Sequence, residues 1–319
     1  MGIKVLIPQM IAQEGMEYLI DHGFEIKIGS GAAEEDLIRD IADCDAILLR
    51  TAAMTENVMK AGKKLKIVAR HGAGYNNVDI KAASRLGIAV TNTPDATTTS
   101  VAEYTIGAML AVTKQLFPCN EQMKNGNFLF KNSCKGMELK GKTLGIIGFG
   151  RIGRLTAQIA HDGLSMKIAA YLNQPSDDMP EYVKILSWEK LFRECDVISL
   201  HVPATAETIG FVGEQEFAWM KESAYFINCS RGEVIKEGEL IRALEAGKIA
   251  GAFMDVFETE PPLSTNPLLH MPNTAVTPHM ASNTEECMTA IAVQAAEQID
   301  HFFHGREPLW IVNNRIKKL

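Results

Sequence analysis

Three residue types that can work together in proton transfer and anion binding follow short apolar runs of the sequence. Arg231, Glu260 and His279 each come within a few residues of the end of such a run. An arginine offers a permanent charge on a planar fork of donors, and a histidine exchanges protons near neutral pH. If the runs are parallel strands, their carboxyl ends lie at one edge of a sheet. The sequence therefore predicts that an arginine, a carboxylate and an imidazole converge at that edge.

A glycine-rich turn lies upstream of these residues. Gly148, Gly150 and Gly153 form the pattern GxGxxG, directly between an apolar run and an amphipathic helical pattern. In that context the first glycine allows a tight turn, the second lets the backbone approach a pyrophosphate, and the third permits close packing of helix on strand. The phosphates meet the amides at the N-terminus of the helix. The turn therefore predicts a dinucleotide site, and an ordinary glycine turn is the weaker interpretation.

The residue expected to meet the adenosine ribose departs from the usual dinucleotide pattern. An acidic side chain normally stands about 20 residues after the glycine turn, and Asn173 occupies that place. Asparagine can hydrogen-bond the ribose hydroxyls, but it lacks the charge that repels a 2′-phosphate. No arginine follows in residues 174–185 to bind such a phosphate. We therefore expect NAD with relaxed discrimination against NADP, unless Asn173 is only a turn residue before Pro175.

The elements that position these residues alternate between apolar runs and helical patterns, which is typical of an open parallel sheet. Six strands are predicted in the second part of the chain, at 143–147, 167–172, 196–201, 225–229, 251–256 and 274–277. Helices such as 152–161 and 237–245 connect them. The first hundred residues repeat the alternation, with strands predicted at 4–7, 25–28, 46–49, 66–69 and 88–91. Two longer amphipathic helices, near 100–115 and 285–304, bracket the six-strand region.

Composition and charge exclude several classes of protein. The 319 residues are 46% hydrophobic and 22% charged, and the formal net charge is −7 with no tract rich in lysine and arginine. The chain fits a globular protein that binds neither nucleic acid nor an anionic membrane. Nothing in the sequence looks like a transmembrane span or a signal peptide. The six cysteines form no CxxC pair and predict free thiols in a reducing, cytoplasmic environment.

Taken together, the motifs resemble those of the D-2-hydroxyacid dehydrogenase family over nearly the whole chain. They are residues 69–79, 100–103, the glycine turn, 201–208, 228–232, 255–262 and 277–279. The family includes phosphoglycerate dehydrogenases, hydroxypyruvate/glyoxylate reductases and D-lactate dehydrogenases. The resemblance implies a Rossmann-type doubly wound parallel sheet that binds NAD, formed by residues 101–282. This domain would be inserted in a smaller, flavodoxin-like α/β substrate domain formed by residues 1–100 and 283–319.

The resemblance also implies the reaction and the roles of the three ionisable residues. A hydride would pass between the nicotinamide and the carbonyl carbon of a 2-oxo acid, giving a D-2-hydroxy acid. His279 would supply the proton that the alkoxide needs, with Glu260 holding the imidazole and favouring its charged form. Arg231 would bind the substrate carboxylate and the developing oxyanion. Glu258 is interpreted as a solvated turn residue, because the family pattern places the catalytic glutamate at Glu260.

Further cofactor contacts follow from the same resemblance. Asp255 is expected at the nicotinamide carboxamide, and Arg151 and Ile152 are expected at the pyrophosphate. Additional contacts are implied at His201, Pro203, Thr208 and Cys229. For Pro203 and Thr208, ordinary turn chemistry is an equal alternative.

Substrate contacts are implied in the first domain. The loop at 72–74 can present backbone amides to a carboxylate, and the family uses it in that way, so Ala73 and Gly74 are expected to bind the substrate. Arg50 and Arg70 match positions at which phosphoglycerate dehydrogenases carry arginines, and they bind a substrate phosphate or are ordinary surface residues. Three histidines have no partner pattern and are predicted to be structural: His22, His71 and His161.

Two alternatives to a simple 2-oxo acid reductase stay open. One is a phosphoglycerate dehydrogenase without a regulatory domain, and the other is a non-enzymatic protein that senses NADH and binds partners, as corepressor relatives do. A homodimer is expected because family members pair through their cofactor domains. The apolar stretch 104–130 is the candidate surface, and core packing is the alternative explanation for it. No metal and no acyl-enzyme mechanism is expected, because the sequence shows neither a metal-ligand cluster nor a GxSxG motif.

Overall fold

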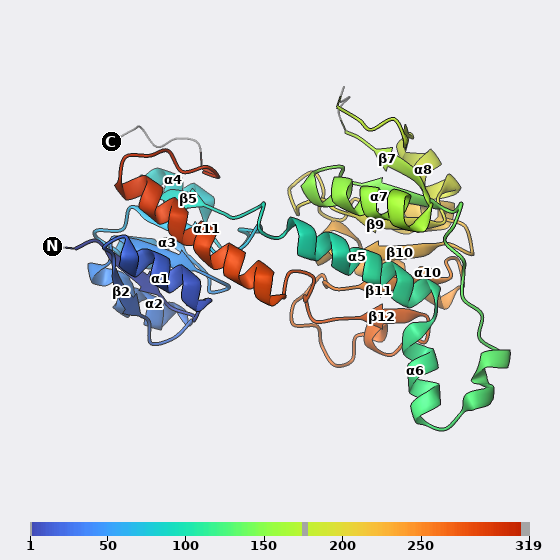
Figure 1. Ribbon diagram of the computed structural model, residues 1–319. Coiled ribbons are helices and arrows are strands. Elements are labelled where there is room, and N and C mark those ends of the chain that lie inside the picture. The colour runs from blue at the N-terminus through green and yellow to red at the C-terminus, as the bar shows by residue number, and fades with distance from the viewer. Residues whose placement is uncertain (1, 174–177, 314–319) are drawn as a thin grey trace. The chain divides into compact units, whose positions relative to one another are not determined.

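The computed structural model describes residues 2–173 and 178–313. The chain forms two compact units, one of Met1–Thr97 with Asn283–Leu319 and the other of Thr98–Ser282. Each unit has a parallel sheet between two layers of helices (Figure 1). The predicted α/β fold class is therefore confirmed. Within the described residues, no helix combines the length and the apolar character needed to cross a bilayer.

The larger unit contains, among its described residues, a sheet of seven parallel strands. Their spatial order is β12 (Thr274–Val276), β11 (Gly251–Met254), β10 (Tyr225–Asn228), β9 (Val197–Leu200), β6 (Thr143–Ile147), β7 (Lys167–Tyr171) and β8 (Val183–Ile185). The order reverses between β6 and β9, and doubly wound sheets bind ligands beyond the carboxyl ends of the strands at such a point. The sequence missed β8, because the strand is three residues long and Lys184 interrupts its apolar run.

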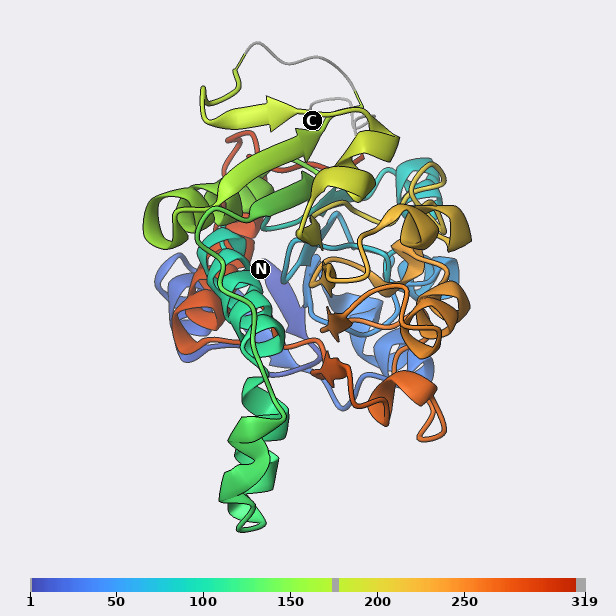
Figure 2. The same cartoon turned by 90° about the vertical axis from the view of Figure 1, so that its right-hand side faces the viewer.

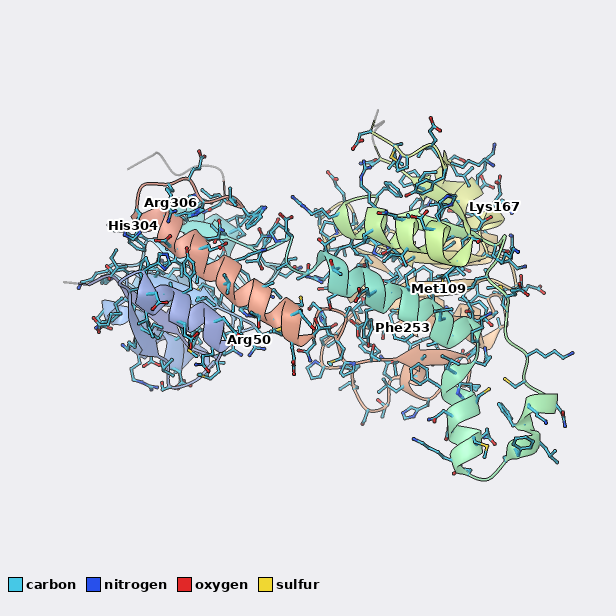
Figure 3. All side chains as sticks on the ribbon, viewed as in Figure 1. Arg50, Met109, Lys167, Phe253, His304 and Arg306 are labelled. Atoms are coloured by element: carbon cyan, nitrogen blue, oxygen red, sulfur yellow. The ribbon has the colours of Figure 1, made fainter. Side chains whose placement is uncertain are left out.

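Helices cover both faces of this sheet. The helices of one face are α5 (Thr98–Thr113) and α7 (Arg151–Leu164), and those of the other are α8 (Trp188–Glu194), α9 (Glu214–Trp219) and α10 (Glu237–Glu245) (Figure 1). Met109 of α5 and Phe253 of β11 are both buried in the core of the first face (Figure 3). Consecutive residues of β10 face opposite cores, Phe226 one and Ile227 the other. Strands buried on both faces explain the continuous apolar runs of the sequence.

The smaller unit has, in its described part, five parallel strands. Their order is β2 (Glu25–Ile28), β1 (Lys4–Ile7), β3 (Ala46–Leu49), β4 (Ile67–Arg70) and β5 (Ala89–Thr91), which is the flavodoxin-like order. One face packs against α1 (Gln13–Asp21) and α11 (Glu285–Phe303), and the other against α2 (Glu34–Asp40), α3 (Glu56–Ala61) and α4 (Ile80–Leu86). Short 3₁₀ turns complete the two units: η1 (Ile41–Asp43), η3 (Gly232–Val234) and η4 (Pro267–Leu269).

One segment of the larger unit leaves the sheet. Its elements are α6 (Leu116–Lys124) and the 3₁₀ turn η2 (Phe128–Asn132), which extend away from the other elements of the unit in Figures 1 and 2. The structure describes every residue of α6 and η2, and none of them is fully buried. The segment returns to its starting point, since the amide of Met137 donates to the carbonyl of Thr113 at 2.7 Å. We call residues 115–136 the arm.

Candidate active site

The glycine turn joins the carboxyl end of β6 to the N-terminus of α7. Gly148 has a φ of +95°, and a Cβ there would collide with the carbonyl of His201, so the position requires glycine. Gly150 is the N-cap of the 14-residue helix, and a Cβ there would meet no atom within 4 Å. Gly153 packs closely against the carbonyl of Gly148. The open space at Gly150 and the N-terminal end of α7 fit a pyrophosphate.

The expected ribose contact lies beside this turn. Asn173 is exposed just beyond the carboxyl end of β7, the strand that neighbours β6. Residues 174–177, part of the stretch inspected for a phosphate-binding arginine, lie outside the described residues. Sequence reasoning looked only downstream of Asn173 and missed Arg154 on α7. Its guanidinium forms an ion pair with Asp178 at 3.3 Å and lies 5.2 Å from the ring centroid of Phe149, so α7 supplies a cation beside Asp178.

The carboxyl ends of β10, β11 and β12 carry the three ionisable residues. His279 Nδ1 lies 2.8 Å from Glu260 Oε2, and Glu260 Oε1 accepts a hydrogen bond from the amide of Phe257 at 3.1 Å. Because an ionised carboxylate only accepts, the imidazole donates through Nδ1. Nε2 is then the ring nitrogen that can exchange a proton with a substrate. The two side chains keep 45% and 37% of their surface exposed, so a ligand can reach them.

The charges around Glu260 keep it ionised. Burial raises the pKa of Glu260, but the hydrogen bond and charge of His279, the amide of Phe257 and the charge of Arg231 together lower it below its usual value. Burial lowers the pKa of Arg231 although the charges of Glu233 and Glu260 oppose this, and an arginine still remains a cation near neutral pH. The Arg231 Nη1 donates to the carbonyl of Ser230 at 2.6 Å. A carboxylate-held imidazole beside a fixed cation can give a proton to an anionic substrate.

Asp255 anchors the loop that carries His279. The backbone of His279 has a left-handed φ of +54°, and its amide donates to the Asp255 carbonyl at 2.8 Å. The Asp255 carboxylate is fully buried and accepts from Thr277 Oγ1 at 2.6 Å, from the Met280 amide at 2.7 Å and from the Ala281 amide at 2.9 Å. These bonds hold a non-glycine residue in that conformation. The contact of Asp255 with the nicotinamide stays a prediction.

Gly232 brings the loop of Arg231 against the loop of Glu260, a role that sequence reasoning did not assign. A Cβ on Gly232 would collide with the backbone of Phe257 and Glu258. The glycine therefore sets the distance between two of the three ionisable residues. Glu258 itself is exposed, and its amide donates to Glu237 Oε2 at 3.0 Å, as expected for a turn residue.

Replacing Gly232 by alanine is expected to lower the free energy of unfolding by about 1–3 kcal/mol, because the added methyl overpacks the loop. Turnover is expected to fall as well, since the Glu260 loop must move. Gly163→Ala on α7 is the matched control, because its Cβ would meet nothing within 4 Å. Urea unfolding and NADH-dependent turnover measure both effects. Equal stability and equal turnover of the two variants would contradict this role of Gly232.

Two further residues predicted to contact the cofactor, His201 and Thr208, have different hydrogen-bond partners in the structure. His201 follows β9, its Nε2 lies 3.0 Å from Ser199 Oγ, and burial lowers its pKa to about 4. Thr208 Oγ1 donates to the Pro203 carbonyl at 2.5 Å and accepts from the Thr205 amide at 2.8 Å, so turn chemistry alone accounts for its hydroxyl.

Three more of these residues flank the glycine turn and the β10 end. Arg151 and Ile152 form the first turn of α7, directly after Gly150. The Cys229 side chain is buried in the core, and burial raises the pKa of its thiol. For all of these residues, contact with the cofactor stays a prediction.

In the smaller unit, the loop expected to bind a carboxylate follows β4. The Gly72 amide donates to Thr93 Oγ1 at 3.0 Å, and Asn92 Nδ2 donates to the Ala73 carbonyl at 2.7 Å. Gly72 has a φ of +133°, and a Cβ there would collide with the Arg70 guanidinium. The side chains of Asn92 and Thr93, just after β5, thus fix the shape of this loop. Gly74, its last residue, is partly exposed to solvent.

Two arginines lie near this loop, at the carboxyl ends of β3 and β4. Burial, together with the charges of Arg50 and Arg70, lowers the pKa of His71 to about 3. His71 is 4% exposed and neutral, which fits its predicted structural role. The Arg50 Nη1 donates to the Met10 carbonyl at 2.7 Å. This end of the sheet carries positive charge suited to an anion.

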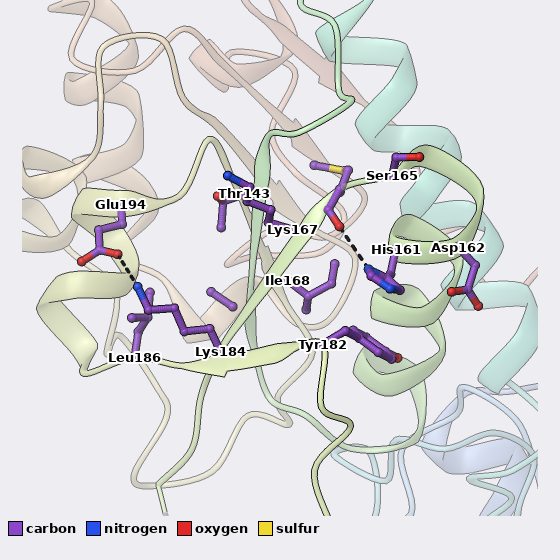
Figure 4. A pocket seen from close by; sticks show the side chains of 12 residues that line it. Thr143, His161, Asp162, Ser165, Lys167, Ile168, Tyr182, Lys184, Leu186 and Glu194 are labelled. Carbon is purple, nitrogen blue, oxygen red and sulfur yellow. Dashed lines mark hydrogen bonds and ion pairs between the residues drawn. The ribbon is translucent and has the colours of Figure 1, made fainter.

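A surface hollow of about 940 Å³ lies near the amino ends of β6 and β7 (Figure 4). Because doubly wound sheets bind dinucleotides at the opposite ends of their strands, the hollow is not the cofactor site. His161 lines it, stacked on Tyr182 at 4.2 Å between ring centroids, with Nδ1 3.3 Å from the Met166 carbonyl. These contacts fit the predicted structural role of His161. In the described part of the chain, no three His, Cys, Asp or Glu side chains gather as metal ligands.

Comparison with known proteins decides the family. Residues 106–281, more than half of the chain, match the family model described as "D-isomer specific 2-hydroxyacid dehydrogenase, NAD binding domain". The chain belongs to this family. The match lies within the larger unit, the one that carries the glycine turn and the three ionisable residues. The resemblance stated from the motifs is thereby confirmed.

Relatives within the D-2-hydroxyacid dehydrogenase family differ in activity. The chain is 38% identical over 306 residues to a D-3-phosphoglycerate dehydrogenase of Archaeoglobus fulgidus, covering 95% of this chain and 58% of that one. It is 34% identical over 325 residues to a glyoxylate reductase of Korarchaeum cryptofilum, covering 99% and 97%. The NADPH-dependent glyoxylate/hydroxypyruvate reductase of Sinorhizobium meliloti, solved with NADP and malonate, superimposes with a TM-score of 0.89 at 28% identity, covering 100% and 99%. The chain spans only 53–59% of the length of three phosphoglycerate dehydrogenases that it matches, that of Archaeoglobus fulgidus among them.

Proposed function

We propose that this member of the family interconverts a 2-oxo acid and a D-2-hydroxy acid with a nicotinamide dinucleotide as hydride partner. The observation that carries the proposal is the 2.8 Å contact between His279 Nδ1 and Glu260 Oε2. It lies at the carboxyl ends of strands whose sheet also holds Arg231 and the glycine turn. An oriented imidazole, a cation and a phosphate-binding turn together are what carbonyl reduction of an acid requires.

The residues divide the chemical tasks among themselves in this proposal. The bound dinucleotide supplies or accepts the hydride. In reduction, His279 gives the proton on Nε2 to the carbonyl oxygen, while Glu260 holds the ring at Nδ1 and balances the charge of the imidazolium. Arg231 binds the substrate carboxylate and polarises the carbonyl with its fork of donors. The backbone amides of Ala73 and Gly74 bind the substrate carboxylate.

The test is NADH oxidation by the purified protein with five 2-oxo acids in parallel. They are hydroxypyruvate, glyoxylate, pyruvate, 2-oxoisocaproate and 3-phosphohydroxypyruvate. At least one is expected to be reduced if His279 gives the proton and Arg231 binds the carboxylate as proposed. If none of the five acids causes NADH oxidation while NADH still binds, as measured by its fluorescence, the proposal would be overturned in favour of an NADH-sensing protein.

A phosphorylated substrate is the second candidate, and Arg50 and Arg70 favour it. Their charges act on His71, at the strand ends next to the loop assigned to carboxylate binding. Two guanidinium groups suit a phosphate, which they can bind with paired hydrogen bonds. A higher kcat/KM for 3-phosphohydroxypyruvate than for hydroxypyruvate would support this candidate. The reverse order would leave the two arginines without a substrate role.

Relaxed cofactor choice is expected from Asn173, and Asn173→Asp should sharpen it. The aspartate adds a charge that repels a 2′-phosphate, so the ratio of kcat/KM for NADH over NADPH should rise about tenfold or more, equal to roughly 1.4 kcal/mol. Asn125→Asp on the arm is the control and should leave the ratio unchanged. A wild-type ratio far above about 1,000, equal to roughly 4 kcal/mol, would rule out relaxed choice.

A homodimer formed through the arm is expected from its apolar surface. Leu116, Phe117, Met123, Phe128 and Leu129 are all at least half exposed. An exposed apolar patch of this kind suits pairing with a second copy. Sedimentation should give twice the 35.0 kDa chain mass, and Leu129→Glu should shift the protein to the monomer. Leu263→Glu, at a position 74% exposed outside the arm, is the control. A wild-type monomer would contradict the proposal.

A further inference from the structure

Two cysteines of the arm face each other. Cys119 belongs to α6, and Cys134 follows η2. Their Sγ atoms lie 3.7 Å apart, although 15 residues separate them in sequence. Both thiols are partly exposed, whereas Cys44, Cys195, Cys229 and Cys287 are buried. The arm therefore holds the two cysteines that a small oxidant reaches most easily.

We propose that Cys119 and Cys134 are a reversible redox site, whose disulfide fixes the arm in one conformation. A disulfide needs its sulfur atoms about 2.0 Å apart. Side-chain rotation and a small shift of α6 against the segment after η2 can close the gap from 3.7 Å. Such a shift is tolerated because the arm, described in full, has no fully buried residue in α6 or η2.

The oxidant is a peroxide, and the reaction balances in two steps. The first thiol loses its proton, the thiolate attacks one oxygen of hydrogen peroxide, and the O–O bond breaks. A sulfenic acid forms, and the hydroxide that is released takes up the lost proton and leaves as water. The second thiol displaces the hydroxyl from that sulfur, the S–S bond forms, and a second water leaves. Two thiols are oxidised by two electrons, and one peroxide is reduced to two waters. A dithiol reductant reverses the change by thiol–disulfide exchange.

The Cys134 thiol ionises less readily than an ordinary cysteine. Burial, the hydrogen bond with Cys119 and its charge raise the pKa of Cys134, and only the thiolate attacks an oxidant.

The position of the pair gives oxidation a structural consequence. The disulfide would close a loop containing Met123, Phe128 and Leu129, the exposed apolar side chains between the two cysteines. The base of the arm is already held, since the Met137 amide and the Lys114 Nζ both hydrogen-bond across it, each at 2.7 Å. The Cys119–Cys134 disulfide would add a covalent cross-link within the arm. It would restrict the motion of the exposed apolar side chains between the two cysteines. The bond forms within one chain, so the inference does not depend on the proposed homodimer.

In the experiment, the reduced 319-residue protein is treated with hydrogen peroxide, the remaining thiols are blocked with iodoacetamide, and the tryptic peptides are mapped by mass. Two of the six thiols should be lost, and the peptide of Cys119 should be joined to the peptide of Cys134. The product should run at monomer mass on a non-reducing gel, and dithiothreitol should restore all thiols. An unchanged thiol count, a link to another cysteine or a link between two chains would overturn the proposal.

Matched variants separate the pair from the other thiols. Cys119→Ser and Cys134→Ser should each abolish the linked peptide, while Cys44→Ala, at a buried cysteine of the smaller unit, should keep it. In the wild type, oxidation should slow amide hydrogen exchange across residues 119–134 at least tenfold, with no change in Cys134→Ser. Exchange that stays the same after the disulfide has formed would overturn the claim that the bond fixes the arm.

Discussion

His279→Gln is expected to lower kcat by about 10²–10⁴-fold, the usual contribution of a general acid or base. Glutamine can still donate a hydrogen bond to Glu260, but its amide is far too weak an acid to transfer a proton to the carbonyl oxygen. The Kd for NADH should stay close to that of the wild type. The glycine turn that is proposed to bind the cofactor phosphates follows β6, whereas His279 follows β12. Steady-state kinetics and NADH fluorescence titration measure the two quantities.

A second histidine variant shows whether the effect belongs to His279. His270→Gln, at an exposed histidine of the same unit, is the control. Wild-type turnover in His279→Gln would refute the assignment.

Arg231→Lys is expected to lower kcat/KM by about 10²–10³-fold, the cost of losing one preorganised donor to a developing oxyanion. Lysine keeps the positive charge, but it loses the planar fork that binds a carboxylate at two points. It also loses the hydrogen bond by which Nη1 is held on the Ser230 carbonyl. The free energy of unfolding should change much less than the activity.

The matched control is Arg242→Lys. Arg242 lies on α10 of the same unit, where it is 66% exposed and pairs with Glu239. Its conservative replacement should leave kcat/KM unchanged. Similar kinetics for the two lysine variants would show that charge alone suffices at Arg231, and the proposed bidentate contact would be wrong.

Much of the fold followed from the sequence because buried parallel strands leave a strong signal. The strands at 143–147, 4–7 and 46–49 have the predicted bounds, since turn residues or polar residues end each apolar run. The edge strand at 25–28 also has the predicted bounds, although its residues are exposed or partly buried. The short edge strand β8 lacks such a run, because one of its faces is exposed. The arm was expected only as an apolar stretch, and nothing in the sequence shows that α6 and η2 leave the sheet.

The candidate site was predictable as a list of residues but not as a set of contacts. Strand ends and family motifs pointed to Glu260 and His279, yet the Nδ1–Oε2 hydrogen bond needs coordinates. From the sequence, Asp255 was predicted to contact the cofactor. In the structure, its carboxylate accepts three hydrogen bonds that hold the loop of His279. Gly232 was missed because close approach of two loops depends on tertiary packing, which a single glycine in a sequence does not reveal.

The configuration of the product tests the central claim most directly. The wild-type protein would be incubated with NADH and hydroxypyruvate or pyruvate, whichever it reduces, and the hydroxy acid analysed by chiral chromatography. The wild type should form the D-enantiomer alone, and His279→Gln should form it at a rate lowered by orders of magnitude. An L-enantiomer, a racemic product or equal product formation by the variant would contradict the claim.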